Sequence, residues 1–330
     1  MKITIGTQEA NQRLDKFLRK YFKKYPEIKL GDIFAWLRKW AIKVNGKKQK
    51  PEYRLKVDDE VQINQDINDL LKNPAQVLIT KDQKTHNLNL GDLKKQILFE
   101  DTNWIFWNKP AWIVVHPGNK HLNDLTLNDY LHAYLKLTNQ RPKSNTFIPS
   151  FGFRLDKDTS WIIVAGKNYE ALKYLNKIIR ERQTIKEYLA IVSWMITKPM
   201  VIQDPLFRWF NKKIGRAQMF VNFQKWVESK TQIEPIKTVN HPILGPVSLT
   251  KAILHTWRMH QIRVHLASKW YPILGDILYG DKKLNHLLAK KFKITRQLLH
   301  SYFYGFWDKF SKKKLAIKAP LPQDFEKIIT

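Results

Sequence analysis

Asp156 is the side chain around which a reaction could be organised. It lies in the segment FRLDKDTS, two residues after Arg154, and precedes an apolar strand at residues 161–165. A carboxylate beside an arginine at the mouth of a buried strand is either a salt-bridged turn residue or a positioned catalytic group, acting as a nucleophile or as a base. Taken alone, the segment is typical of a salt-bridged turn.

Two later segments carry further side chains that could contact a substrate. Tyr188 lies at the start of a second apolar strand, two residues after Lys186. Arg258, His260 and Arg263 lie on a stretch with helical character. Each segment alone is ordinary in a globular protein, so only the spacing and order of the whole set can indicate a functional site.

Together these segments resemble the RluA-type RNA pseudouridine synthases, particularly the RluC/RluD branch. The family patterns are H-R-L-D-x-x-T-S-G, N-K-P-A-G-x-x-V-H-P, K-x-Y-x-A-x-V, G-R-T-H-Q-I-R-V-H-L-A and P-I-x-G-D-x-x-Y-G. This chain has them, with changes, at residues 153–161, 108–117, 186–192, 257–267 and 272–280. The resemblance implies isomerisation of uridine to pseudouridine, with large-subunit ribosomal RNA of the 23S type favoured over transfer RNA.

The resemblance also implies roles for individual residues. Asp156 would be the catalytic carboxylate, as nucleophile or base, and Arg263 would pair with it and keep it ionised. Tyr188 would offer an aromatic face to the flipped uracil and a hydroxyl near its C5 proton. Arg154 would fill the vacated base position, and the remaining RNA contacts would come from Arg258, His260 and Lys186. The bond changes require no cofactor and no metal.

Apolar β-like runs and helical segments alternate along the larger part of the chain. From residue 97 onward, β-like runs such as 161–165 and 186–192 alternate with helical stretches. We therefore predict one domain of mixed helices and strands over 97–330. The resemblance implies that it is an α+β catalytic domain with the pseudouridine synthase fold, a mixed and mainly antiparallel sheet and a central cleft. The polar residues 65–96 are predicted to be a linker with short elements.

Residues 1–64 form a smaller basic unit with 16 basic and 8 acidic residues. A helix with one apolar face at residues 11–24, a second helical stretch, a tight turn at Asn45-Gly46 and a closing strand follow one another. This order resembles the alpha-L RNA-binding domain first described in ribosomal protein S-four. The alternative interpretation is a solvated basic helix face.

The composition limits the class of partner. The chain has 330 residues and a formal net charge of +29, which favours a polyanionic partner such as RNA. No stretch of about 18 uncharged apolar residues exists, so we expect no membrane partner and a cytoplasmic location. We also expect a monomer. The absence of cysteine excludes disulfides, thiolate metal sites and cysteine nucleophiles.

Two rival functions differ in class from the isomerase. A non-catalytic RNA-binding or ribosome-assembly factor would need only the basic N-terminal unit and the charge. A methyltransferase would need a glycine-rich cofactor loop, which the sequence lacks. Convergence of Asp156, Tyr188 and Arg263 in one cleft would favour the isomerase.

The glycine and tryptophan counts are both 12, which is low for glycine and high for tryptophan. Seven tryptophans stand where the family patterns have glycine or where the local context is similar: Trp40, Trp112, Trp161, Trp194, Trp226, Trp257 and Trp270. Trp40 and Trp270 also fall just after helices, where a left-handed glycine is preferred. We hypothesise that these positions are UGA codons that the source organism reads as glycine.

Overall fold

The computed structural model describes residues 1–329 apart from 26–27, 65, 68–87, 117–124, 143, 145, 154–155, 212–215 and 225–226. Arg154, Pro117 and Trp226 therefore lie outside the described residues, as does most of the predicted linker. Among the described residues, no helix is long and apolar enough to cross a membrane.

The N-terminal unit consists of two helices packed on a three-stranded antiparallel sheet. The strands run in the order β1 (Lys2–Thr4), β3 (Glu60–Ile63) and β2 (Ile42–Val44). The helices are α1 (Leu14–Tyr21), extended by the 3-10 turn η1 (Phe22–Lys24), and α2 (Leu30–Arg38). The unit has a hydrophobic core of its own, separate from the clusters in the rest of the chain.

Two local predictions in this unit are confirmed. The apolar residues of the 11–24 helix, Leu14, Phe17, Leu18 and Phe22, are all at most 2% exposed. Asn45 and Gly46 both have positive φ, at 49° and 73°, as a two-residue turn between β-strands requires. The backbone of Val44 and that of Lys47 exchange two hydrogen bonds across this turn.

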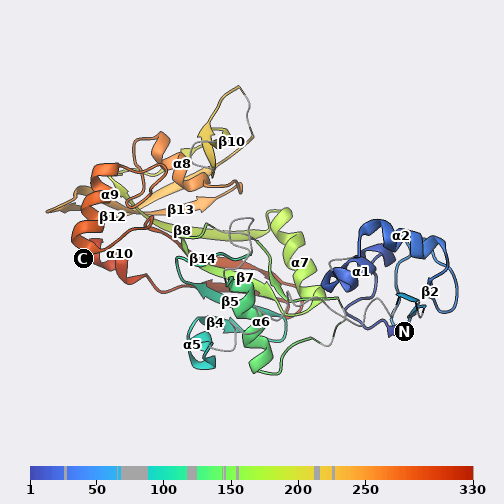
Figure 1. The fold of residues 1–330 in the computed structure, drawn as a ribbon. Coiled ribbons are helices and arrows are strands. Elements are labelled where there is room, and N and C mark those ends of the chain that lie inside the picture. Colours follow the sequence, from blue (N-terminus) through green and yellow to red (C-terminus); the bar gives the residue numbers. More distant parts are fainter. Residues whose placement is uncertain are drawn as a thin grey trace.

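The part of the chain predicted to be the catalytic domain is built on one ten-stranded sheet (Figure 1). Its main path is β4 (Ile97–Glu100), β5 (Trp104–Lys109), β7 (Ser160–Gly166), β14 (Leu299–Asp308), β8 (Thr184–Ser193), β13 (Gly245–Leu254), β12 (Thr231–His241) and β9 (Met200–Ile202). β15 (Lys313–Lys318) pairs with β14, and β6 (Ser150–Phe151) pairs with β7. Among these described pairs, β7–β14 is parallel and the others are antiparallel, which confirms the predicted mixed, mainly antiparallel sheet.

Helices cover both faces of this sheet. They are α5 (Leu90–Lys95), α6 (Leu127–Leu137), α7 (Tyr169–Arg180), α8 (Gln261–Ser268), α9 (Lys282–Phe292) and α10 (Gln323–Ile329). On β5, Ile105 and Trp107 pack in one cluster with α6, whereas Trp104 and Phe106 pack in another with α7. Alternate residues of a strand face opposite sides, so the continuous apolar run reflects burial of β5 on both faces.

The same alternation operates on β8. Tyr188, Ala190 and Val192 pack with α8, whereas Leu189 and Ile191 pack with α9 and α10. Tyr188 therefore belongs to the α8 face because of its register in the strand.

The parallel junction between β7 and β14 brings together residues far apart in sequence. His300 is paired with Ser160, and Ser301 is paired both with Trp161 and, on the other side, with Tyr188. Asp156 precedes β7 by four residues. It therefore lies near the end of β7 that pairs with β14, and β14 in turn pairs with β8 at Tyr188.

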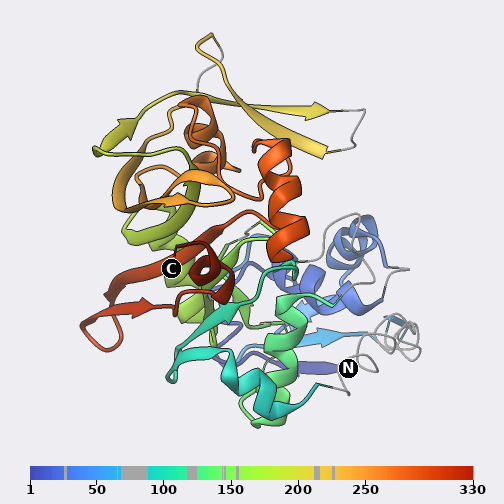
Figure 2. The same cartoon turned by 90° about the vertical axis from the view of Figure 1, so that its left-hand side faces the viewer.

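A separate two-stranded hairpin, β10 (Leu206–Asn211) and β11 (Arg216–Val221), projects at one end of the molecule (Figure 2). Trp209, Phe210 and Phe220 on it are 44–57% exposed. The hairpin touches the rest of the domain through Leu206 and Met219, which pack against Val264 of α8.

Candidate active site

Asp156 and Arg263 form an ion pair at the N-terminal end of α8. Nη1 of Arg263 donates to Oδ2 of Asp156 over 2.8 Å. Arg263 is only 4% exposed, whereas the Asp156 side chain keeps 24% of its surface exposed. The buried arginine therefore holds a carboxylate that is partly exposed to solvent. The pairing of these two residues is the one that was predicted.

A second carboxylate, Asp276, holds Arg263 from the other side. Nε and Nη2 of the arginine donate to its two oxygens over 2.7 and 2.8 Å. Burial by itself would lower the pKa of Arg263, but the hydrogen bonds and charges of Asp276 and Asp156 outweigh it and raise that pKa. For Asp276, burial opposes ionisation, and the hydrogen bonds and charge of Arg263 overcome it and lower the pKa. The arginine is thus permanently charged and fixed in orientation.

The loop that carries Asp276 is fixed by its backbone. The amides of Leu278 and Tyr279 donate to Oδ1 of Asp276. Gly275 has φ +78°, and a Cβ there would lie 1.9 Å from the carbonyl oxygen of Arg296. Glycine is therefore required directly before this carboxylate.

His260 caps the N-terminal end of α8 with φ 54°. Its Nδ1 lies 2.8 Å from the hydroxyl of Tyr279, and its Nε2 lies 3.6 Å from Oδ1 of Asp156. Burial, partly offset by the charge of Asp156, lowers the pKa of His260, so the ring is neutral at neutral pH. The Tyr279 hydroxyl also accepts a hydrogen bond from the amide of Met219, which links the β10–β11 hairpin to the site.

Tyr188 and Asp156 line one cavity of about 460 Å³. Arg263, Arg258 and His260 line it too, together with Arg208 of the hairpin and Trp257. Tyr188 is 1% exposed, its hydroxyl is hydrogen-bonded to Ser301, and burial raises its pKa well above the usual value. It therefore remains a neutral phenol in the wall of the cavity.

The structure places Lys186 differently from Arg258 and His260, two of the other predicted RNA contacts. It does not line the 460 Å³ cavity; it is 6% exposed, and its Nζ lies 3.7 Å from the centre of the Trp257 ring. Phe153 and Tyr304 also lie within 6 Å of this nitrogen. Burial lowers the pKa of Lys186 to about 7.

Lys109 supports the loop of Asp156 and was not singled out from the sequence. It is fully buried, and its Nζ donates to the carbonyls of Pro110, Ile113 and Lys157 over 2.8 to 2.9 Å. Lys157 directly follows Asp156, so Lys109 ties the catalytic loop to the end of β5. The signal for it was the N-K-P motif, in which a lysine ends a buried strand.

The site offers no metal centre within the part of the chain that the structure describes. No three His, Asp or Glu side chains there are grouped in a way that could hold a metal ion. Asp156 and Asp276 are instead bridged by Arg263, whose cation already occupies the space between the two carboxylates.

A partly exposed carboxylate fixed by a buried arginine, an aromatic ring in the same cavity and basic side chains in its lining define a site suited to a polyanionic substrate. Residues 103–268 match the family model described as RNA pseudouridylate synthase. Over 98% of its length, the chain is 31% identical to "Ribosomal large subunit pseudouridine synthase C" of Buchnera aphidicola subsp. Acyrthosiphon pisum, of which it covers 95%.

Other relatives agree. The protein of the same name from Pasteurella multocida is 31% identical over 99% of this chain and 92% of its own, and "Ribosomal large subunit pseudouridine synthase D" of Escherichia coli K12 is 27% identical over 99% and 92%. The solved structure of human RNA Pseudouridylate Synthase Domain Containing 1 has a TM-score of 0.55 at 22% identity, over 68% of this chain and 82% of that one, and supports the fold.

The chain belongs to the RNA pseudouridylate synthase family, in its RluC/RluD-type branch. It is an isomerase that converts uridine in RNA to pseudouridine. These findings confirm the predicted family and activity, and they give no support to the non-catalytic RNA-binding factor.

Proposed function

We propose that this enzyme modifies uridines in large-subunit ribosomal RNA, with Asp156 as the catalytic carboxylate. Relatives named for the large ribosomal subunit align with nearly the whole chain, which supports the RNA class. The net charge of +29 suits a long polyanion. The observation that carries the residue assignment is the Arg263–Asp156 ion pair, which opens into the cavity that Tyr188 also lines.

The reaction exchanges one bond of the base for another. The bond from N1 of uracil to C1′ of the ribose breaks, the base turns, and a bond from C5 to C1′ forms. A proton leaves C5 and one is gained at N1, so the product is an isomer and no electrons are transferred to an outside acceptor. Asp156 serves either as a nucleophile or as a base on the sugar, and Arg263 keeps its position through the cycle.

Tyr188 contributes as a neutral residue in this proposal. Because burial raises its pKa, a phenolate base is unfavourable at neutral pH. Its ring instead forms one wall for the detached uracil, and its hydroxyl stays hydrogen-bonded to Ser301. This wall of the cavity keeps the base in place while the base turns.

The rim of the cavity supplies the RNA contacts. A uridine in a folded RNA must be extruded, at a cost of a few kcal/mol. Arg258 and His260 line the cavity, and we assign them to the flanking nucleotides. We keep the prediction that Arg154, outside the described residues, fills the vacated base position.

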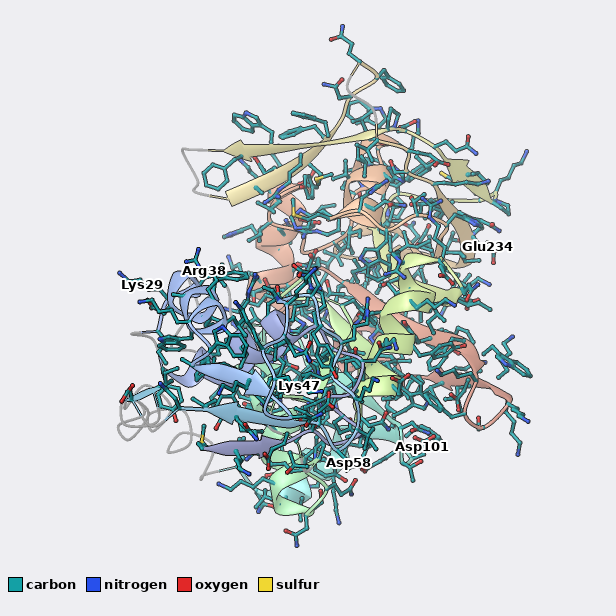
Figure 3. All side chains as sticks on the ribbon, turned by 90° about the vertical axis from the view of Figure 1, so that its right-hand side faces the viewer. Lys29, Arg38, Lys47, Asp58, Asp101 and Glu234 are labelled. Atoms are coloured by element: carbon teal, nitrogen blue, oxygen red, sulfur yellow. The ribbon has the colours of Figure 1, made fainter. Side chains whose placement is uncertain are left out.

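We further propose that residues 1–64 are an alpha-L RNA-binding domain. The two helices and the sheet follow the predicted order. Lys29, Arg38 and Lys47 extend from its surface (Figure 3), and all three are exposed. The enzyme would act as a monomer in the cytoplasm, the compartment of ribosomal RNA in its bacterial relatives.

The experiment that tests this function maps pseudouridines in total RNA from cells with and without the gene. Sites in large-subunit ribosomal RNA that disappear on deletion should return with the wild-type gene and should not return with Asp156→Asn. Loss of transfer RNA sites alone would contradict the proposed substrate. Return of the sites with Asp156→Asn would contradict the role of the carboxylate.

A further inference from the structure

We propose that a basic groove between the N-terminal unit and α7 holds the backbone of the substrate RNA outside the active site. This inference rests on the proposed function, because it concerns the same RNA. The groove, here called the interdomain groove, encloses about 1210 Å³, compared with about 460 Å³ for the cavity at Asp156. α1 and α7 lie side by side along it (Figure 1).

The two sides of the groove are held together by specific contacts. Oε1 of Gln8 accepts a hydrogen bond of 2.8 Å from the amide of Tyr169, the first residue of α7. Oε1 of Glu9 accepts one of 2.5 Å from the hydroxyl of Ser144, and Glu9 is 1% exposed. Both acceptors come from the N-terminal unit, so these bonds set its orientation on the catalytic domain.

Positive charge lines both sides. The N-terminal unit contributes Lys16, Lys20, Lys23 and Arg54. The catalytic domain contributes Lys173, Lys177, Arg180 and Lys309. Among the described residues that line the groove, Glu170 is the one carboxylate, and it already lies 3.5 Å from Lys173 and 4.0 Å from Lys309. Eight cations in the lining therefore face a single carboxylate among the described residues that line the groove.

The mutual effect of these cations is visible at Lys20. Burial and the neighbouring charge of Lys16 lower its pKa, and the charge of Glu9 offsets this only in part. An anion bound between the two domains would relieve this repulsion. The concave shape suits a chain of phosphates better than a flat surface, and the rings of Tyr169 and Tyr174 lie among the lysines, where they could stack on bases.

The position of the groove fits an RNA that continues from the active site. α7 follows β7 closely, and β7 has seven residues, which span roughly 20 Å at about 3.3 Å per residue. Asp156 lies before one end of β7 and the groove begins beyond the other. Nucleotides in the groove are therefore several positions away from the flipped uridine.

The test compares two triple variants in the full-length protein. Lys173→Gln/Lys177→Gln/Arg180→Gln removes three exposed cations of α7, and Lys282→Gln/Lys283→Gln/Lys290→Gln removes three exposed cations of α9 as a matched control. Binding is measured against salt with a long ribosomal RNA fragment, and turnover is measured with a short hairpin that carries only the target loop.

For the long RNA, the α7 variant should bind roughly tenfold or more weakly, and the slope of log K against log salt should become shallower by up to about 2 to 3. Turnover on the saturating short hairpin should match the wild type. If the α7 variant has the same salt slope and the same affinity as the wild type and the α9 control, the groove does not bind the RNA. Failure of the wild type to form pseudouridine in either RNA would contradict the proposed function instead.

A second inference comes independently from the backbone. We infer that glycine occupies positions 40, 112, 194 and 270 in the protein as its own cell makes it, and that the other three hypothesised positions share this origin. Trp40, Trp112, Trp194 and Trp270 have φ of 63°, 77°, 71° and 67°. Bulky residues rarely adopt this left-handed conformation, whereas glycine adopts it freely.

The hydrogen bonds after α2 and α8 show why the backbone turns there. After α2, the amide of Ala41 donates to the carbonyl of Trp36, and after α8, the amide of Tyr271 donates to the carbonyl of Leu266. Both are the bonds of a helix end closed by a left-handed residue, at Trp40 and Trp270 respectively. These were the two positions at which the sequence predicted such a residue.

The sign of φ, and not exposure, separates the same four tryptophans from the five outside the hypothesised set. The four are 54–84% exposed, so their rings gain little from burial. The five tryptophans outside the hypothesised set, Trp36, Trp104, Trp107, Trp209 and Trp307, are absent from the residues with positive φ. A codon that one genetic code reads as tryptophan and another reads as glycine explains why these four tryptophans differ from the five outside the hypothesised set.

Trp257 shows what this means for the site. Its backbone is not left-handed, but its ring lines the 460 Å³ cavity and covers Nζ of Lys186. Glycine at 257 would enlarge the cavity and open it toward Lys186. The predicted RNA contact of that lysine then becomes geometrically accessible.

Mass spectrometry of peptides from the natively expressed protein tests this inference directly. Glycine is expected at positions 40 and 270, and tryptophan at either would overturn the common origin. A second measurement compares thermal unfolding of recombinant variants. Trp40→Gly/Trp270→Gly should raise Tm, whereas the control Trp307→Gly, an exposed strand residue with ordinary φ, should lower it. A fall in Tm for the double variant would contradict the backbone argument.

Discussion

Asp276 holds Arg263 through two parallel hydrogen bonds of 2.7 and 2.8 Å, and both partners are buried. This fork leaves Nη1 of the arginine directed at Asp156. A single bond to Asp156 would let the guanidinium rotate, whereas the bidentate bond fixes its plane. The carboxylate that faces the cavity is thus positioned from behind by a second carboxylate.

Replacing Asp156 with asparagine should abolish isomerisation and leave RNA binding largely intact. The substitution keeps the size of the side chain but removes the negative charge and the nucleophilic oxygen pair. Product formation is measured by pseudouridine detection on a short RNA, and binding by a shift assay. Turnover near that of the wild type would remove Asp156 from the mechanism.

Arg263→Ala should impair both turnover and folding. It leaves Asp276 buried without its counter-charge, a loss of about 3–5 kcal/mol for a buried pair. Denaturant unfolding and single-turnover kinetics measure the two effects separately. An unchanged rate would show that the ion pair with Asp156 has no part in the reaction.

Asp276→Asn should affect the reaction through positioning. We expect kcat to fall by roughly 10- to 100-fold, because a carboxylate misplaced by about 1 Å can cost that much, while KM for RNA changes by only a few fold. The exposed Asp92→Asn in α5 is the control. An equal fall in kcat for both variants, or a change confined to KM, would contradict a positioning role.

In the chain with tryptophan at 257, whose ring covers Lys186, this buried lysine makes stability depend on pH. Its pKa in the folded chain is about 7, against 10.5 in the absence of burial. Between these values the unfolded chain binds a proton that the folded chain does not, so this lysine makes the free energy of unfolding rise with pH from about 7 to about 10.5. Below pH 7 the lysine is charged in both states and the rise ends.

Lys186→Met should remove that rise. In thermal unfolding from pH 6.5 to 10, the Tm of the wild type minus the Tm of the variant should increase as the pH increases. The exposed Lys173→Met is the control and should follow the wild type. A constant difference in Tm between wild type and Lys186→Met would show that the lysine keeps its ordinary pKa.

The sequence predicted several local elements, and the roles of the site residues stay predictions. The apolar face of α1, the Asn45-Gly46 turn and the helix at α7 follow from periodicity and turn chemistry within a short window. The convergence of Asp156, Tyr188 and Arg263 was predicted through the family resemblance, and the β7–β14–β8 register provides its physical basis.

Other features depend on contacts that no local pattern contains. The role of Asp276 arises from a pairing with a residue 13 positions earlier on α8, and Lys109 reaches the carbonyl of Lys157, 48 positions away. The burial of Lys186 depends on which rings pack over one strand position. The helix α5 lies within the predicted linker, and its Leu93 joins the core beneath α6.

Deleting residues 1–64 should weaken RNA binding more than catalysis. The deletion removes 16 basic and 8 acidic residues together with one side of the interdomain groove. The hydrophobic core of this unit is separate from the clusters around the catalytic sheet, so the remaining domain should still fold. Fewer phosphates are then neutralised, and the slope of log K against log salt becomes shallower.

The measurement that checks this deletion is a salt titration of the full and truncated proteins on the same RNA, with turnover on a saturating short hairpin as the control for folding. Turnover should persist because Asp156, Tyr188 and Arg263 all lie outside the deleted segment and line one cavity of the remaining domain. Retained turnover with identical slopes and affinities would mean that the N-terminal unit does not touch RNA. Its lysines would then be a solvated surface, and the interdomain groove would lose one of its two sides as an RNA contact.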